Sequence, residues 1–332
     1  MKPLRVGVVG ATGMVGKSFQ ELLVERKFPI AELRPFASDK SLGQSIELGG
    51  KAWPIQILRP GCFAGLDLVF FSSGDDISKE WAPQAVKSGA FAVDNSAAFR
   101  MDPGTALVVP EVNGDLLSAM RGKAQVIANP NCSTIQLVVA LNPLLQNFGI
   151  ERVTVASYQA VSGAGLEAYQ ELQDQVKNPS LPAKALAHPI AFNTIPQIGS
   201  IGENGFSGEE MKVMKETRKI LRHSSLRVSA FTVRVPVLNA HAEAVWVTLG
   251  QDVTEEKLRQ TLQNGPGLVI QDDPKSGIYP LQNKVSGLDP VYVGRIHRDL
   301  DDRNTWLMWV VADNIRKGAA LNGIQIAEVL FQ

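Results

Sequence analysis

The chain has 332 residues, of which 45% are hydrophobic and 20% charged, and this is ordinary for a globular protein of about two domains. Basic and acidic residues both number 33, so the zero net charge supplies no basic field for nucleic acid or an anionic membrane. The two cysteines, Cys62 and Cys132, argue against a disulfide framework, and no paired histidine spacing completes a metal ligand set. We therefore expect an α/β protein of a reducing compartment, without a metal.

The start of the chain and its apolar runs bear on location. Residues 1–5 lead directly into an apolar strand and not into the hydrophobic segment of a signal peptide. No apolar run reaches the length needed to cross a bilayer. A cytoplasmic protein is expected, with neither membrane nor nucleic acid as a partner.

A glycine-rich turn follows the first strand. Residues 6–9 form a short apolar run, the turn comes next, and an apolar helix extends from residue 15 to about residue 26. The glycines permit a tight turn, close approach of a pyrophosphate and close helix–strand packing, with the phosphates at the helix N-terminus. This pattern predicts dinucleotide binding, although a glycine-rich turn that binds nothing would look similar. The loop residues concerned are Gly10, Thr12, Gly13, Met14, Val15 and Gly16.

The end of the second strand bears on the choice of dinucleotide. Residues 32–37 form this strand, and Ser38, Asp39, Lys40 and Ser41 follow it. An acidic residue near this point binds the ribose 2′-OH of NAD, whereas cationic and hydroxyl groups suit the 2′-phosphate of NADP. Ser38, Lys40 and Ser41 favour NADP and Asp39 opposes it. Lys40 could also be a solvated loop charge.

Alternating strands and helices continue through the first half. Strands at 66–71 and 91–94 flank a helix at 78–88, so the pattern predicts a parallel sheet covered on both faces. Arg100 lies just beyond a strand end, where ligands bind in such sheets. It is a candidate anion site, and a surface salt bridge is the alternative.

Cys132 stands where a strand at 124–128 and an Asn-Pro-Asn turn give way to an apolar helix that extends to about Phe148. The free N–H groups and the positive dipole end of a helix favour a thiolate over a thiol, and the thiolate is the nucleophile. A small buried hydrophobic side chain is the alternative role for a free cysteine. The position makes Cys132 a candidate catalytic residue.

The second half is richer in strands. Residues 152–159, 226–235 and 242–249 predict an α+β domain with an antiparallel or mixed sheet, and residues 179–205 predict a long excursion. A capping box at Ser207 opens a helix to about Arg222. A terminal helix from about Asn314 has one apolar face, which we expect to dock on the first domain. The expected domains are residues 1–131, completed by 313–332, and residues 132–312.

Over essentially its whole length the chain resembles the aspartate-β-semialdehyde dehydrogenase family. The resemblance implies a Rossmann-like, parallel-sheet NADP-binding domain and an α+β catalytic and dimerisation domain that forms a homodimer. The segments that carry it are residues 10–16, 93–100, 109–113, 129–136, 157–163, 209–212, 234–241 and 313–320.

The resemblance implies NADPH-dependent conversion of 4-phospho-L-aspartate to L-aspartate 4-semialdehyde and phosphate, a reversible step in lysine (diaminopimelate), threonine, methionine and isoleucine biosynthesis. Cys132 would attack the acyl carbon and form a thioacyl intermediate. His241 would take the thiol proton and return it to the departing group. Gln159 would orient the intermediate, while the Asn131 side chain and the Cys132 backbone N–H would hold the oxyanion.

The remaining implied roles concern substrate and cofactor. Arg234 would bind the substrate carboxylate and Glu209 its ammonium group, while Arg100 and Lys212 would hold the phosphate. Outside the family context, Glu209 and Lys212 could be a helix-surface pair, and His241 a buried strand-end histidine. Ser162, Gly163 and Asn314 would complete the cofactor site.

Two alternatives remain open at this point. One is a related acyl-phosphate or acyl-CoA reductase that acts on N-acetylglutamyl phosphate or malonyl-CoA, in which Glu209 would have no free amine to bind. The other is a regulator that binds NADPH without turnover.

Overall fold

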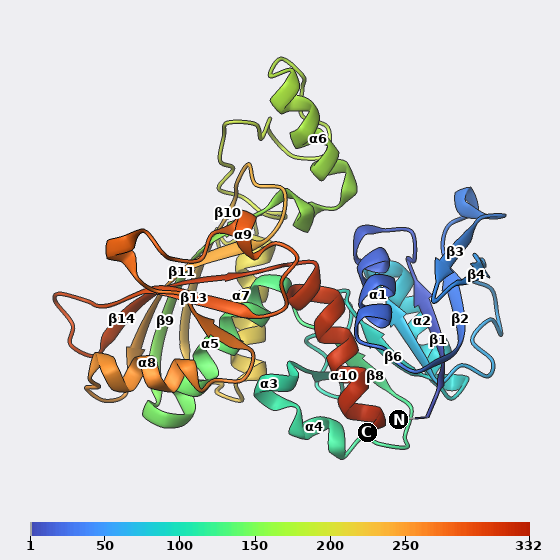
Figure 1. Cartoon of the computed structure of the whole chain (residues 1–332), viewed down its shortest axis with the longest axis horizontal. Coiled ribbons are helices and arrows are strands. Elements are labelled where there is room, and N and C mark those ends of the chain that lie inside the picture. The colour runs from blue at the N-terminus through green and yellow to red at the C-terminus, as the bar shows by residue number, and fades with distance from the viewer. Residues whose placement is uncertain (1) are drawn as a thin grey trace. The chain divides into compact units, whose positions relative to one another are not determined.

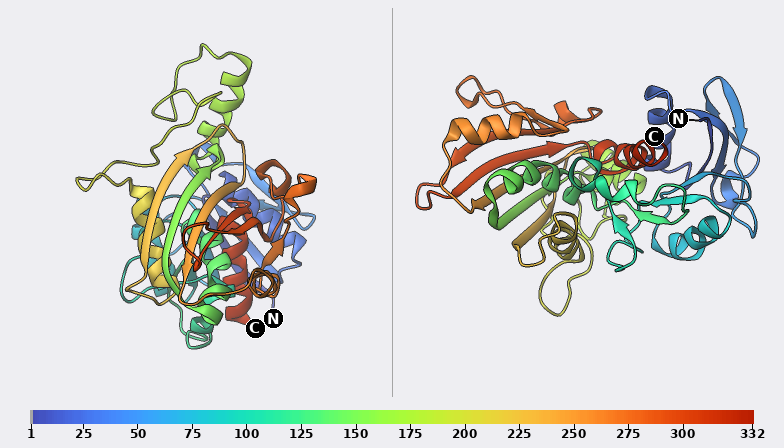
Figure 2. Two further views of the ribbon diagram at one scale, coloured as in Figure 1. Left: turned by 90° about the vertical axis from the view of Figure 1, so that its left-hand side faces the viewer. Right: turned by 90° about the horizontal axis from the view of Figure 1, so that it is seen from below.

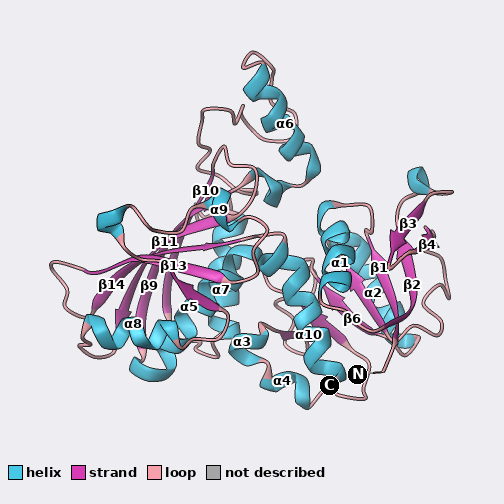
Figure 3. Cartoon of the chain, viewed as in Figure 1, coloured by secondary structure: helices cyan, strands magenta, loops and turns pink. Residues whose placement is uncertain are grey.

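The computed structural model describes residues 2–332. They form two compact units, one of residues 2–130 together with Ala319–Gln332 and the other of Asn131–Gly318. Asn131 and residues 313–318, which the sequence analysis assigns to the first domain and the terminal helix, group with the second unit here. Figures 1 and 3 show the elements of both units. Within the described chain, no helix is long and apolar enough to cross a membrane.

The first unit is built on a six-stranded sheet in the order β2-β1-β5-β6-β8-β7, and every pair in it is parallel. β5 and β6 are buried along their whole length, as expected of parallel strands covered on both faces. The strand bounds are β1 Leu4–Val9, β2 Ile30–Phe36, β5 Leu68–Phe71, β6 Phe91–Asp94, β7 Ala106–Leu107 and β8 Val126–Ala128.

Helices cover this sheet on both faces. Alternate strand residues feed two separate cores, one containing Phe19 and Phe70 and the other Phe71 and Trp81. The terminal helix contributes Ile324 to the first of these cores, so it completes the unit although it is remote in sequence. The other elements are α1 Met14–Glu25, α2 Asp75–Lys87, α3 Pro110–Asn113, α4 Asp115–Ser118, α10 Leu321–Phe331 and the hairpin β3 Ser45–Leu48 with β4 Lys51–Pro54.

The second unit has a mixed six-stranded sheet in the order β10-β9-β11-β14-β13-β12. β9 pairs in parallel with β10 and antiparallel with β11. The helices α5 Cys132–Phe148, α7 Gly208–Ile220 and α8 Glu255–Gln263 pack against the sheet. The strand bounds are β9 Ile150–Gln159, β10 Arg227–Arg234, β11 His241–Leu249, β12 Leu268–Ile270, β13 Val291–Arg298 and β14 Thr305–Ala312.

The excursion from this unit is longer than predicted. It includes the helix α6 Leu166–Lys177 as well as the irregular residues up to Gly205. Figure 2 shows α6 and the loops after it projecting away from the second sheet. Another short helix, α9 Gln282–Val285, precedes β13.

Candidate active site

The N-terminus of α5 places Cys132 at the first helical position. The Asn131 side-chain oxygen caps this helix by accepting the backbone N–H groups of Ser133 (3.1 Å) and Thr134 (3.2 Å). The first turn contains no acidic residue that would offset the positive end of the helix dipole. The predicted helix therefore begins where the sequence indicates, and the dipole favours a thiolate at Cys132.

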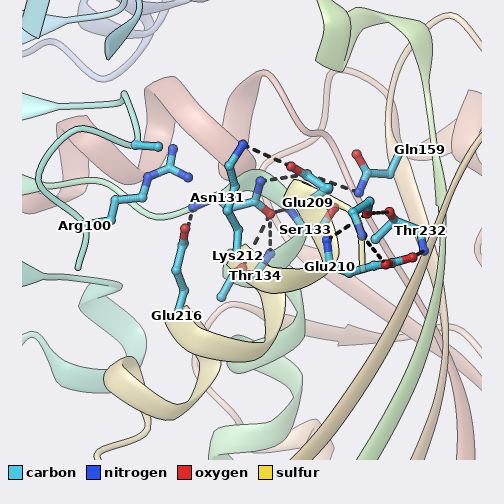
Figure 4. A network of polar contacts seen from close by, with 12 residues as sticks. Arg100, Asn131, Ser133, Thr134, Gln159, Glu209, Glu210, Lys212, Glu216 and Thr232 are labelled. Atoms are coloured by element: carbon cyan, nitrogen blue, oxygen red, sulfur yellow. Dashed lines mark hydrogen bonds and ion pairs between the residues drawn. The ribbon is translucent and has the colours of Figure 1, made fainter. Parts of the chain in front are cut away.

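A network of hydrogen bonds centred on Glu209 fixes the residue before the cysteine (Figure 4). Oε1 of Glu209 accepts the Asn131 amide (2.8 Å) and the Gln159 amide (3.3 Å), and Oε2 lies 3.4 Å from Nζ of Lys212. The backbone N–H of Asn131 donates to Glu216 at 2.7 Å. These contacts bring four of the predicted residues, Asn131, Gln159, Glu209 and Lys212, into one cluster.

The first turn of α7 presents Glu209 to this network. The predicted capping box is present, because the Ser207 hydroxyl accepts the N–H of Glu210 and the Glu210 carboxylate accepts that of Ser207. Glu210 also accepts the N–H of Thr232 at 3.1 Å, which ties α7 to β10. The capping box thus keeps the adjacent Glu209 directed toward Asn131.

The Asn131 side chain makes two kinds of contact in this geometry. Its oxygen caps α5 and its amide nitrogen donates to the Glu209 carboxylate. These contacts fix the side chain beside the first turn of the helix that begins at Cys132. Its predicted role as an oxyanion donor stays a prediction.

Arg234 and His241 stand at the ends of β10 and β11. Arg234 is 4% exposed and donates from Nη1 to the carbonyl of Ala160 at 2.7 Å. Burial lowers the pKa of Arg234, and the acidic groups of Glu209 and Cys132 oppose that change. By reciprocity, this guanidinium favours a thiolate on Cys132.

His241 is fully buried, and its Nδ1 accepts the backbone N–H of Ala160 at 3.0 Å. Burial, and then the charge of Arg234, hold the pKa of His241 well below its ordinary value, with a smaller opposite effect from the Ala240 carbonyl. A neutral ring that accepts at Nδ1 carries its hydrogen on Nε2. In this arrangement Nε2–H is a donor, and the predicted transfer of the thiol proton to His241 stays a prediction.

Two glycines leave room for the reacting groups. A Cβ atom on Gly163 would lie 2.9 Å from both Nη1 of Arg234 and Nε2 of His241. A Cβ atom on Gly318 would lie 2.8 Å from Cβ of Cys132. Gly318 belongs to a π-helical turn, Arg316–Ala320, and such turns occur frequently at functional sites. Sequence reasoning included Gly163 as a cofactor residue and missed Gly318, for which the run Lys-Gly-Ala-Ala was the available signal.

Ser162 and Asn314, predicted to bind the cofactor, lie in a buried network around the turn before His241. Asn314 donates to Oγ of Ser162 at 2.9 Å and accepts the N–H of Ala240 at 2.9 Å. Ala240 has a φ of 69°, a left-handed conformation that costs a non-glycine residue free energy. The two side chains thus stabilise the strained residue that precedes His241.

Arg100 belongs to the first unit and is 7% exposed. Its Nε donates to the carbonyl of Asn129 at 3.0 Å and its Nη2 to that of Asn95 at 2.8 Å. Two backbone carbonyls orient this guanidinium, and its burial differs from the exposed position of a surface residue. A fixed, buried guanidinium at a strand end suits an anion.

The glycine-rich loop fits a dinucleotide. Gly10 has a φ of 81°, and a Cβ atom on it would lie 2.8 Å from the carbonyl oxygen of Ser72. A Cβ atom on Gly16 would lie 2.2 Å from the carbonyl oxygen of Gly10, so helix and loop approach as closely as predicted. α1 begins after Gly13 with neither a side-chain cap nor an acidic residue in its first turn. Its N–H groups and dipole are thus suited to phosphate.

A cavity of about 500 Å³ adjoins this loop within the first unit. Gly10, Phe36 and Ser38 line it together with Trp81 from α2. Ser38 is thus at the cavity, while Lys40 and Ser41 lie on the short 3₁₀ turn that follows, Asp39–Ser41. An apolar cavity beside a phosphate-binding turn suits an adenosine moiety. Trp81 was not among the predicted residues, because an apolar residue inside a helix gives no separate signal. Among residues 2–332, no three His, Cys, Asp or Glu side chains gather as metal ligands.

The comparisons with known proteins agree with both units. Residues 5–120 match the family described as "Semialdehyde dehydrogenase, NAD binding domain", and residues 141–317 match "Semialdehyde dehydrogenase, dimerisation domain". The fold and site thus define a semialdehyde dehydrogenase with a nucleotide-binding domain and a dimerisation domain, which confirms the predicted fold class.

Similar proteins narrow this class. The aspartate-semialdehyde dehydrogenase of Aquifex aeolicus is 46% identical, with 99% of this chain and 98% of the relative covered. That of Bacillus subtilis is 43% identical over 98% and 97%. The structure of aspartate semialdehyde dehydrogenase II from Vibrio cholerae complexed with ASA has a TM-score of 0.95 and 40% identity, and covers 100% and 99%. A Candida albicans enzyme with NADP has a TM-score of 0.79 and 26% identity, with 99% of each chain covered.

This chain belongs to the aspartate-semialdehyde dehydrogenase family. It is therefore an oxidoreductase of aspartate-family amino-acid biosynthesis. The family predicted from the sequence is confirmed.

Proposed function

We propose that this enzyme interconverts 4-phospho-L-aspartate and L-aspartate 4-semialdehyde through a thioacyl intermediate on Cys132, with NADP as cofactor. The observation that carries the proposal is Cys132 at the N-terminus of α5, whose first turn has no acidic residue and where the buried Arg234 also favours a thiolate. The thiolate sulfur forms a bond to the acyl carbon, and the carbon–oxygen bond to phosphate breaks. The phosphate leaves with the bonding electron pair.

His241 acts in this proposal as a neutral hydrogen-bond donor. Its Nε2–H faces the space beside Gly163, and in the tetrahedral adduct it donates to the developing oxyanion or to the departing oxygen. The backbone N–H at residue 132 is the second donor. The helix dipole and Arg234 favour the Cys132 thiolate, so proton transfer to His241 is not required.

Substrate binding uses the other predicted residues. Arg234 binds the α-carboxylate, Glu209 the ammonium group, and Gln159 orients the acyl group beside Cys132. Arg100 and Lys212 bind the phosphate that leaves. The position of Glu209 between two amides and Lys212 fixes a hydrogen-bond acceptor that can meet a substrate amine.

The first unit is proposed as the NADP-binding domain. Residues 10–16 hold the pyrophosphate at the N-terminus of α1, the cavity beside Ser38 takes the adenosine, and Lys40 with Ser41 meets the 2′-phosphate. Gly163 with the network of Ser162 and Asn314 borders the nicotinamide. When bound, the cofactor supplies or accepts the hydride. The unaltered enzyme should prefer NADP to NAD by at least about tenfold in kcat/KM. Replacing Lys40 by Ala should reduce that preference. Equal kcat/KM for NAD and NADP in the unaltered enzyme would contradict the assignment.

One assay tests the reaction itself. NADP reduction is followed with L-aspartate 4-semialdehyde, with and without inorganic phosphate, and should depend on both. Activity with N-acetylated glutamate semialdehyde, or with malonate semialdehyde and CoA, would favour the related reductases. NADP binding without turnover of any of these substrates would favour a regulator.

The second unit is proposed as the catalytic and dimerisation domain of a cytoplasmic homodimer. The sheet face opposite α5 exposes aromatic side chains, including Phe231 (54% exposed) and Trp246 (37%). Trp246 and Trp309 line a shallow cavity of about 390 Å³ on it. An exposed aromatic sheet face suits a self-complementary contact with a second copy. Light scattering of the unaltered chain should give a dimer mass and Trp246→Glu a monomer, and a monomeric unaltered chain would contradict the proposal.

A further inference from the structure

A second set of buried polar groups lies between α5 and β11. Among the described residues, the Ser133 hydroxyl, both amide atoms of Gln136, Nε2 of His241 and both carboxyl oxygens of Glu243 have no hydrogen-bond partner. Gln136, His241 and Glu243 are 0% exposed. Buried polar groups without partners are few in native proteins, and each one calls for an explanation. The proposed reaction uses His241 but leaves Gln136 and Glu243 without a role.

The positions of these residues form a simple pattern. Cys132 and Gln136 are four residues apart on α5 and so share a face of the helix. His241 and Glu243 are two residues apart on β11 and so share a face of the sheet. α5 packs against β11. The amide and the carboxyl therefore lie along the same helix–strand contact as the nucleophile and the histidine.

Among the described residues, Glu243 forms no ion pair that would stabilise its charge. Across the sheet it lies opposite Ser157 on β9 and Val310 on β14, neither of which is charged. The titratable groups on the nearest elements are His241 on the same strand and Cys132 on α5, and Arg234 stands two strands away on β10. Burial raises the pKa of Glu243 well above 4.5, and the nearby amide of Gln136 is the smaller, opposing influence. Burial thus favours the protonated, neutral form of the Glu243 carboxyl.

We propose that Glu243 and Gln136 form a buried positioning pair that keeps Cys132 at its working distance from His241. A protonated carboxyl donates one O–H, and the amide carbonyl of Gln136 accepts it. The bond ties the first turns of α5 to the start of β11. Reaction rates are sensitive to such distances, because a misplacement of about 1 Å can cost roughly 100-fold. The inference rests on the roles proposed above for Cys132 and His241.

The experiment compares side chains of similar volume in a Cys62→Ser background, which leaves Cys132 as the thiol that is alkylated. Glu243→Gln keeps a neutral hydrogen-bonding group, while Glu243→Met and Gln136→Met remove one partner. Val247→Ala on the same face of β11 is the matched control, because it opens a cavity in the core away from the pair. The measurements are kcat, KM, thermal unfolding, and the rate of Cys132 alkylation by iodoacetamide as a function of pH.

We expect Glu243→Gln to keep kcat within about threefold, because a neutral donor is retained. Glu243→Met and Gln136→Met should each lower kcat by about 10–100-fold with KM changed less than about threefold. Both should shift the pH profile of Cys132 alkylation, whereas Val247→Ala should lower the unfolding temperature and leave kcat and that profile unchanged.

Two results would overturn the proposal. If both Met variants keep kcat and the alkylation profile, the pair fills space only. If Glu243→Gln loses as much activity as Glu243→Met, the group acts as a carboxylate and not as a neutral donor. Either result leaves the proposed reaction intact, provided that the Cys132→Ala variant is inactive. An active Cys132→Ala would overturn the proposed reaction itself.

Discussion

Two groups of buried polar side chains meet the first turns of α5, and they differ in how their hydrogen bonds are completed. Around Glu209, the carboxylate accepts two amides and an ammonium group, and Asn131 has partners for its oxygen and its nitrogen. Around Glu243, both carboxyl oxygens and the facing amide have none. The first group resembles a structural scaffold.

The second group carries a free-energy cost, since an unsatisfied buried polar group costs about 1–3 kcal/mol. Such costs persist mainly where they serve function. His241 is part of this second group, and its open Nε2 is the atom that the reaction needs. In the first group the hydrogen bonds are complete before substrate binds, whereas in the second His241 keeps Nε2 open for the reacting groups.

The largest effect is expected from the nucleophile. Cys132→Ser should lower turnover by at least about three orders of magnitude while NADP binding persists, because an alcohol offers no accessible anion near neutral pH. Cys62→Ser is the control and should stay active. Cys62 is a half-buried residue of the first unit, and burial raises the pKa of its thiol. Steady-state kinetics and NADP titration of the two variants make the comparison. Retained activity in Cys132→Ser would contradict covalent catalysis.

A smaller loss of turnover is expected when the space beside the Cys132 thiol is filled. Gly318→Ala would place a methyl group 2.8 Å from Cβ of Cys132 and should lower kcat about 10–100-fold by displacing it. Gly104→Ala is the matched control, because a Cβ atom there meets nothing within 4 Å and the backbone is unstrained. Turnover of the two variants should separate clearly. Equal kcat values would show that the π-helical turn around Gly318 accommodates the methyl group without displacing Cys132.

Changes in the hydrogen-bond network around Glu209 should lower the free energy of unfolding. Asn131→Ala removes the cap of α5 and one donor to Glu209, and we expect a loss of about 2 kcal/mol in free energy of unfolding. Asn147→Ala, an exposed residue near the other end of the same helix, should cost about 0.5 kcal/mol or less. Urea unfolding measures both. If the two variants cost the same, the network around Glu209 contributes little.

The smallest effect is a pH dependence of stability. The pKa of Glu243 is higher in the folded than in the unfolded chain, so folding favours its protonated form. Its contribution to stability is present below the unfolded value of 4.5 and is lost as pH rises toward the folded pKa. Glu243→Gln does not titrate, so its free energy of unfolding relative to the unaltered chain should increase with pH. Thermal unfolding of both chains at pH 5 and pH 8 tests this direction. A stability difference in favour of Glu243→Gln that becomes smaller toward pH 8 would contradict it.

Much of the first unit could be predicted from the sequence, because its strands are continuous apolar runs and glycines mark its turns. The predicted strand 91–94 coincides with β6, and the predicted helix after Cys132 with α5. Strands β13 and β14 were not predicted. β13 mixes charged and apolar residues and contains an irregularity between Gly294 and His297, so its alternation is interrupted.

The site was predictable as a set of residues and less so as chemistry. Cys132, Glu209 and Asn131 were named from motifs, and the second unit brings them together. The tautomer of His241 depends on the N–H of Ala160, which is 81 residues away in sequence. The roles of Gly318 and Glu243 likewise follow from packing between distant segments. Periodicity and spacing do not encode such contacts.

The central claim is that Cys132 carries the acyl group. The most direct measurement mixes enzyme, NADP and L-aspartate 4-semialdehyde without phosphate and follows the first turnover. We expect a burst of NADPH of about one equivalent per active site, and an acyl group on the peptide that contains Cys132. Absence of a burst with an active enzyme, or an acyl group on another residue, would contradict it.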